Sequence, residues 1–162
     1  MDEKSFLVYA SPIGEIRLHF EGACLTGLYF TDENVNHSHT PHTAAQADCA
    51  RQLDEYFAGT RRTFTLDMRL EGTAFRRRAW QALCDIPYGQ TRSYKAQADA
   101  IGNPKAVRAI GGANHHNPIS IIVPCHRVIG ANGLLTGYGG GLWRKEWLLE
   151  HEKKHSQFVE NT

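Results

Sequence analysis

The sequence predicts an α/β protein of the α+β kind, in which a small N-terminal antiparallel sheet with one helix precedes a mostly helical part. Three observations support this fold class. Short β-rich runs that alternate between apolar and polar residues fill the first thirty positions. Apolar residues at helical spacing dominate after about residue 73. The charge changes sign at the same place, so the predicted domains are 1–72 and 73–162, with the boundary at Glu71-Gly72.

Three strands are expected in the first domain, over 5–10, 13–20 and 23–30, and the turn residues between them suggest an antiparallel meander. The stretch 31–43 is polar and rich in histidine, which predicts a loop. Apolar residues at helical spacing over 44–58, ending at Gly59, predict one helix. A further strand over 62–66 would complete this domain.

The second domain begins with a predicted helix over 73–84, where Thr73 can cap the first turn. A second helix is expected over 93–101, stopped by Gly102. Asn103-Pro104 would then start a third helix that runs to about His115. The last helix is expected from Leu142 to about Lys153.

The second and third of these helices are joined by a tight turn that contains glycine, which makes them a helix-turn-helix candidate. The second helix of the pair would present Lys105, Ala106 and Arg108 to a DNA groove. Many helical hairpins bind nothing, so the pattern alone also fits a purely structural role.

The charge distribution points to an anionic partner. The whole chain carries 18 Lys and Arg against 17 Asp and Glu, a formal net charge of +1. Residues 1–72 hold 6 basic and 11 acidic side chains, whereas residues 73–162 hold 12 basic and 6 acidic ones. A basic half within a neutral chain favours a nucleic acid or another acidic surface as partner.

Four cysteines, at positions 24, 49, 84 and 125, are far apart in sequence and form no C-x-x-C pair, so neither a disulfide framework nor a zinc site is expected. Cys24 and the histidines at 37, 39 and 42 suggest zinc ligands by residue type, but their spacing does not repeat, and we expect no metal. The chain has no apolar run long enough for a membrane span, and its acidic start lacks the features of a signal peptide. We therefore expect a cytoplasmic protein, or a nuclear one in a eukaryote.

The segment 117–128 contains the strongest chemical signal in the chain. An apolar run, expected to be a strand, is cut by Pro124, and Cys125 follows directly beside His126 and Arg127. Neighbouring positive charge favours the thiolate, which is the nucleophilic form of cysteine. These residues indicate a reactive cysteine with a base beside it, although an inert buried cysteine fits the same pattern.

Three motifs occur in the second domain: the run 102–109 (GNPKAVRA), the segment Pro124-Cys125-His126-Arg127-Val128 and the run 145–152 (KEWLLEHE). Together they resemble the O6-alkylguanine-DNA alkyltransferase family, also called methylated-DNA--protein-cysteine S-methyltransferases. The resemblance spans about residues 75–152, and within it the sequence is most similar to the bacterial and archaeal members of the family. It implies a ribonuclease H-like N-terminal domain and a C-terminal domain with a winged helix-turn-helix.

The resemblance implies direct reversal of DNA damage. Cys125 would take the alkyl group from O6 of guanine, and to a lesser extent from O4 of thymine, in a single irreversible step without a cofactor. Tyr94 would donate a proton to N3 of the base, and His126, linked to Glu152 and through a water to Cys125, would remove the thiol proton. Asn117 would hold the turn that carries the cysteine.

The resemblance also implies that a monomer binds double-stranded DNA through the minor groove and flips the alkylated base out of the stack. Arg108 would fill the gap in the duplex, and Ala106 would allow close approach of the helix. The other DNA-binding residues are expected to be Lys95, Asn103, Arg127 and Tyr138. The run 76–78 (RRR) would contact phosphates or form a solvated helix face. The chain departs from some relatives at His115-His116 and Gly139, which alters the lip of the expected pocket, and at Ser120, which is consistent with a roomier pocket.

Two other functions remain open at this point. A non-catalytic DNA-binding module could sense alkylated bases or regulate genes, although such relatives lack a cysteine at the position of Cys125. A cysteine hydrolase could use the same Cys-His pair and would turn over many times.

Overall fold

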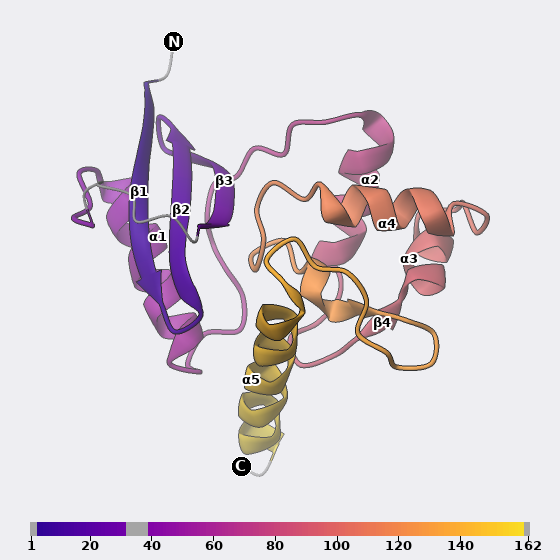
Figure 1. Cartoon of the computed structure of the whole chain (residues 1–162). Helices are drawn as coiled ribbons and strands as arrows, with labels where there is room; N and C mark the ends of the chain where they lie inside the picture. The colour runs from indigo at the N-terminus through magenta and orange to yellow at the C-terminus, as the bar shows by residue number, and fades with distance from the viewer. Residues whose placement is uncertain (1–2, 32–38, 161–162) are drawn as a thin grey trace. The chain divides into compact units, whose positions relative to one another are not determined.

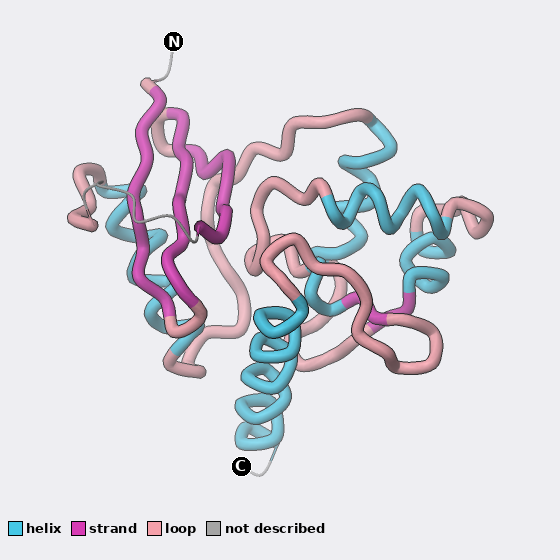
Figure 2. Tube along the Cα trace, viewed as in Figure 1, coloured by secondary structure: helices cyan, strands magenta, loops and turns pink. Residues whose placement is uncertain are grey.

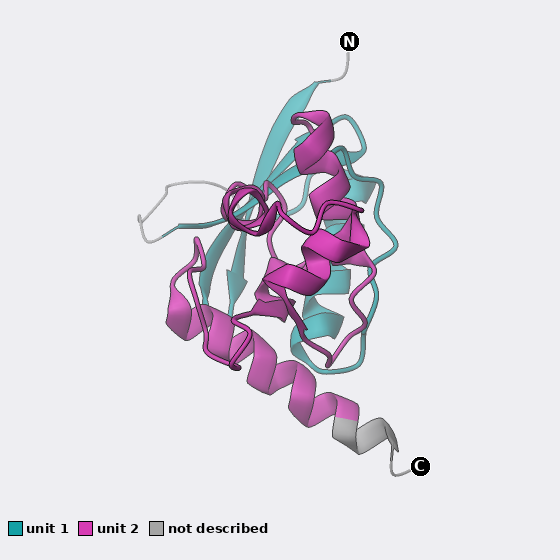
Figure 3. Ribbon diagram, turned by 90° about the vertical axis from the view of Figure 1, so that its right-hand side faces the viewer, with its two compact units in different colours: residues 1–70 teal, residues 71–162 magenta. Residues whose placement is uncertain are grey.

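The structure is a computed structural model that describes residues 3–31 and 39–160, with side chains as far as residue 156. The chain divides into two compact units, Met1–Leu70 and Glu71–Thr162, coloured separately in Figure 3. Each unit is built around its own set of buried apolar side chains.

The first unit is a three-stranded antiparallel sheet with one helix, as expected. Strands β1 (Lys4–Ser11), β2 (Gly14–Glu21) and β3 (Cys24–Thr31) lie in the order β1-β2-β3 (Figure 1). The register pairs Leu7 with Leu18 and Leu18 with Leu28, so the buried leucines share one face. Helix α1 (Ala44–Phe57) begins at Thr43, whose side chain accepts a hydrogen bond from the Gln46 backbone N–H.

The expected strand over 62–66 is not formed. A side chain of α1 instead forms hydrogen bonds with the backbone of this segment. The Gln52 amide accepts from the Thr65 N–H at 2.9 Å and donates to the Thr65 carbonyl at 3.2 Å. Pairing with β3 is limited to an isolated parallel bridge between Leu25 and Met68. Residues 32–38 of the expected histidine-rich loop, His37 among them, lie outside the described residues.

The second unit is mostly helical (Figure 2). Helices α2 (Ala74–Cys84), α3 (Tyr94–Ala100) and α4 (Val107–His115) pack around small residues, chiefly Ala79, Ala98 and Ala113, which allow close approach of the helices. The elements that complete the unit are strand β4 (Arg92–Ser93), the 3-10 helix η1 (Cys125–Arg127), strand β5 (Val128–Ile129) and helix α5 (Leu142–Glu160), with β4 and β5 paired in parallel.

Helix α4 starts three residues later than the sequence indicates. The Ala106 N–H donates to the Asn103 carbonyl at 3.0 Å, so 103–106 form a turn rather than a first helical turn. Gly102, with φ of 73°, reverses the chain before this turn. Ala106 therefore occupies the N-cap position and Arg108 lies in the first turn of α4. The last helix, α5, also continues beyond the expected end, to Glu160.

The apolar run before Pro124 is a buried series of turns and not the expected strand. The Val123 N–H donates to the Ile119 carbonyl, and the Ile122 N–H donates to the Ser120 carbonyl. Ile121 adopts φ of 74°, which is unusual for a β-branched residue and which a strand cannot contain. None of the described helices is long and apolar enough to span a membrane.

Candidate active site

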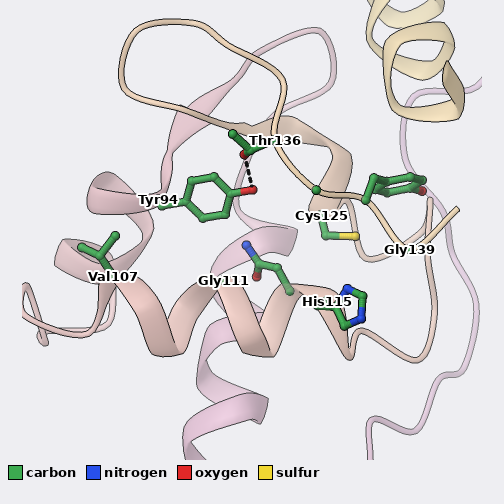
Figure 4. Close-up of a pocket in the computed structure, with 10 residues that line it drawn as sticks. Tyr94, Val107, Gly111, His115, Cys125, Thr136 and Gly139 are labelled. Carbon is green, nitrogen blue, oxygen red and sulfur yellow. Dashed lines mark hydrogen bonds between the residues drawn. The ribbon is translucent and has the colours of Figure 1, made fainter. Parts of the chain in front are cut away.

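A pocket of about 420 Å³ in the second unit contains Cys125 (Figure 4). Three parts of the unit form its walls: the start of α3, one side of α4, and the loop that precedes α5. The residues that line it are Tyr94, Val107, Gly111, Asn114, His115, Cys125, Thr136, Gly137, Tyr138 and Gly139. A concave site of this size, with a thiol and several convergent polar side chains, is suited to a small ligand.

Asn117 fixes the turns that carry Cys125. Its Oδ1 accepts from the Ile119 N–H at 3.0 Å, and its Nδ2 donates to the Val123 carbonyl at 2.7 Å. The Asn117 side chain also lowers the pKa of the Cys125 thiol in part, against the effect of burial, which raises it. One buried amide thus holds both ends of the turn series that leads to Cys125, the candidate nucleophile.

Cys125 is a protonated thiol at neutral pH. Only 7% of the residue is exposed, and this burial raises the pKa of the thiol above its ordinary value, while Asn117 and the positive charge of Lys145 lower it in part. A thiol is a poor nucleophile. A nucleophilic role for Cys125 would therefore need a base that removes the proton as the sulfur attacks.

The groups that could supply this base are fully inside the protein. His126 Nε2 and Glu152 Oε2 lie 2.7 Å apart, and both residues are at most 1% exposed. The Arg127 guanidinium donates to the same carboxylate, from Nε to Oε1 at 2.8 Å and from Nη2 to Oε2 at 3.1 Å. The carboxylate is therefore held between two buried donors.

Burial lowers the pKa of His126, although the Glu152 charge opposes this effect, so the imidazole is neutral at rest. Burial raises the pKa of Glu152, but His126 and Arg127 outweigh it and hold the pKa well below the ordinary range. Among the described residues, His126 Nδ1 has no hydrogen-bond partner. With Nε2 bound to Glu152, Nδ1 is the ring nitrogen that can take up a proton.

Arg127 does not have the exposed, DNA-binding position expected from the sequence. It is 7% exposed, and its third polar contact runs from Nη1 to the Ile86 carbonyl at 2.7 Å. The guanidinium is occupied by Glu152 and the backbone, because leaving that carboxylate buried without a counter-charge would be costly. The prediction that Arg127 binds DNA is therefore wrong.

Tyr94 and Thr136 form the opposite wall of the pocket, where the Thr136 hydroxyl donates to the Tyr94 hydroxyl at 2.8 Å (Figure 4). Lys145, which sequence reasoning missed, supports this wall. Its Nζ donates to the carbonyls of Val128 at 2.6 Å and Thr136 at 2.8 Å and lies 5.9 Å from the centre of the Tyr94 ring. Its spacing of seven residues from Glu152, two helical turns, places both on one face of α5 and could have indicated it.

The other expected DNA contacts gather around the turn between α3 and α4. Lys95, Asn103 and Arg108 are exposed, and Ala106 is partly exposed at the start of α4. Tyr138 instead lines the pocket, where burial and the neighbouring Cys125 raise its pKa. No cluster of three or more potential metal ligands occurs within 3–31 and 39–160.

Two family models match the chain. The ribonuclease-like domain of 6-O-methylguanine DNA methyltransferase matches residues 6–70, and the DNA-binding domain of the same family matches residues 74–154. Since the two matches cover most of the sequence, the chain belongs to the 6-O-methylguanine DNA methyltransferase family.

Individual relatives agree with this assignment. The methylated-DNA--protein-cysteine methyltransferase of Mycobacterium tuberculosis H37Rv is 52% identical over 149 residues, which are 90% of each chain. The constitutive enzyme of the same name from Bacillus subtilis is 45% identical over 154 residues, with 88% of this chain and 92% of the relative covered. The crystal structure of the M. tuberculosis protein in complex with DNA superposes with a TM-score of 0.85, at 51% identity and 93% coverage of both chains.

Proposed function

We propose that Cys125 is the acceptor in an irreversible, stoichiometric transfer of an alkyl group from O6 of guanine in DNA, and to a lesser extent from O4 of thymine. Direct repair by alkyl transfer is the activity of the relatives that match over most of the chain, and DNA is the partner. The observation that carries the residue assignment is the buried Cys125, which is followed directly by a histidine that is itself buried and paired with Glu152.

The reaction is a displacement at the alkyl carbon. The Cys125 sulfur forms a bond to that carbon as the bond between carbon and O6 breaks, and the electron pair of the broken bond passes to the purine. His126 takes the thiol proton, directly or through a water, and the Glu152 carboxylate stabilises the resulting imidazolium. The product is a thioether, which has no leaving group that would regenerate the thiol.

Tyr94 supplies the second proton transfer. The departing purine gains negative charge, and a proton delivered to its N3 neutralises that charge. The Tyr94 hydroxyl faces the pocket, and because it accepts a hydrogen bond from Thr136 its own proton is free to point at the base. The carbonyl contacts of Lys145 hold the loop that carries Thr136 in place.

The target base must leave the duplex to reach a buried thiol. We infer that a monomer binds the minor groove, with Arg108 in the gap, Ala106 in close contact and Lys95 and Asn103 on the backbone. The exposure of Arg108, Lys95 and Asn103 around the turn between α3 and α4 agrees with these contacts. Tyr138 would contact the flipped base rather than a phosphate, since it lines the pocket. We infer a cytoplasmic location, or a nuclear one in a eukaryote, because the proposed substrate is genomic DNA.

A labelled duplex tests this function. Incubation with DNA that carries O6-[³H-methyl]guanine should move one label per chain onto the peptide that contains Cys125. The Cys84→Ala variant is the matched control, because Cys84 is the exposed cysteine of the same unit and should not accept the group. Methyl removal by a Cys125→Ala variant would refute the assignment. Lesion binding without transfer by the intact protein would indicate a lesion sensor, and repeated turnover on an ester would indicate a hydrolase.

A further inference from the structure

We propose that His115 binds the phosphate of the flipped nucleotide, so that the pocket prefers an alkylated base in a DNA strand over the same base free in solution. This role rests on the proposed function and adds a residue that determines the form of the substrate. The residue acts on binding and takes no part in the transfer itself.

The position of His115 carries the inference. It is the last residue of α4, it is exposed, and it lines the pocket that contains Cys125. Figure 4 shows its ring at the end of α4, on the side of Cys125 and Gly139. A base that enters the pocket remains attached to a sugar and two phosphates, and these groups must stay at the exposed mouth.

Few side chains that line the pocket could bind an anion such as a phosphate. Among the ten described residues that form the pocket, His115 has the only side chain that can carry a positive charge. Lys145 lies behind the wall, with its Nζ bound to the carbonyls of Val128 and Thr136. An imidazole donates an N–H to an anionic oxygen in either of its charge states, and most protein contacts to DNA are made to phosphate and sugar.

The geometry of α4 agrees with this role. Arg108 and His115 are seven residues apart, about 10 Å along the helix axis. They therefore lie on one face, with Arg108 placed to enter the duplex and His115 beside the pocket that receives the base. One helix would thus contact the DNA at both ends of the distortion.

His116 provides a matched control. It is an exposed histidine next in sequence, but it does not line the pocket, and its Nδ1 lies 2.8 Å from the Gly112 carbonyl. Its ring packs edge to face against that of His115, with centroids 5.2 Å apart. If the effect of substituting His115 came only from a lost nonspecific charge or from lower helix stability, substituting His116 would slow the reaction to the same extent.

The experiment compares second-order rates of alkyl transfer from a lesion-bearing duplex and from the free base O6-benzylguanine. His115→Ala should slow the reaction with the duplex about three- to tenfold, as expected for one lost phosphate contact. Its rate with the free base should stay within about twofold, since the free base has no phosphate. His115→Gln keeps an N–H donor and should recover part of the duplex rate, while His116→Ala should match the wild type on both substrates.

Three results would overturn the role of His115: an equal loss on both substrates, an equal loss in His116→Ala, or no recovery in His115→Gln. The first of these would mean that the side chain only shapes the pocket. Failure of the wild-type protein to transfer an alkyl group from either substrate would overturn the proposed function itself and is recognised before any variant is compared.

Discussion

Glu152→Gln tests the buried charge network most directly. The substitution keeps the size of the side chain but places an amide NH₂ against donors from Arg127 and His126, which now bond to the carboxylate at 2.7–3.1 Å. Arg127, 7% exposed, then lacks a counter-charge. Loss of one partner from a buried pair costs about 3–5 kcal/mol, a large share of a typical free energy of unfolding of about 5–15 kcal/mol.

The rate of alkyl transfer should fall as well, by a factor of about 10² when it is expressed per folded molecule, because the imidazolium formed at His126 loses its negative partner. Urea unfolding followed by circular dichroism gives the stability, and single-turnover transfer from a labelled duplex gives the rate. Glu150→Gln is the matched control, since Glu150 is an exposed glutamate on the same helix. It should leave both quantities unchanged.

A double variant separates folding from chemistry. Arg127→Met in the Glu152→Gln background removes the unpaired guanidinium, so it should recover at least about 1.5 kcal/mol of stability without restoring the rate. If Glu152→Gln unfolds within about 0.5 kcal/mol of the wild type, the carboxylate does not pair as described. If the double variant regains the wild-type rate, the charge on Glu152 has no part in the proton transfer.

Three further predictions concern the pocket wall, the turn before α3 and the effect of pH. Tyr94→Phe should slow transfer at least about tenfold in single-turnover assays. Thr136→Val removes the same hydrogen bond but keeps the phenol, so it should slow transfer less. Equal losses of rate in the two variants would contradict proton donation by Tyr94. Gly89→Ala should destabilise the protein by about 1–3 kcal/mol more than Gly102→Ala. Both glycines have positive φ, but only at residue 89 would an added Cβ collide with α5. Equal urea concentrations at the unfolding midpoints of the two variants would refute this. The pKa of His126 is lowered from 6.5, so stability should be constant above that pH and fall as the pH drops below it, where the unfolded chain binds the proton. The transfer rate should fall only at lower pH, where the folded protein protonates His126; a rate that rises only on the alkaline side would mean that thiol ionisation, not His126, controls the reaction.

The elements found from the sequence are those whose causes are local. Side-chain caps at Thr43, Thr73 and Ser93 start three helices within a residue of the expected place. Alternating apolar residues give the three strands of the first sheet, because a strand with one buried face must repeat every two residues. The segment around Cys125 could also be identified as a candidate site from the sequence, because the thiol, the imidazole and the guanidinium belong to three consecutive residues.

The errors concern segments whose partners are distant in sequence. The run 62–66 has strand-like composition, but Gln52 of α1 takes its backbone groups. The run before Pro124 has the apolar pattern of a strand, but Asn117 holds it in turns. In both cases a side-chain amide competes with strand pairing, and local preference cannot reveal which prevails.

The sequence by itself determined the two-part α+β plan and the basic character of the second half, and it selected Cys125 as the candidate nucleophile. Only the tertiary structure decided what each charged group does. Arg127 and Lys145 are cations of a kind usually found at the surface. In the structure, however, Arg127 donates to Glu152 of α5, and Lys145 donates to the Thr136 carbonyl of the pocket loop. The physical reason is that burial makes an unpaired charge costly, so the role of a charged side chain is set by the partner that the fold provides and not by its neighbours in the chain.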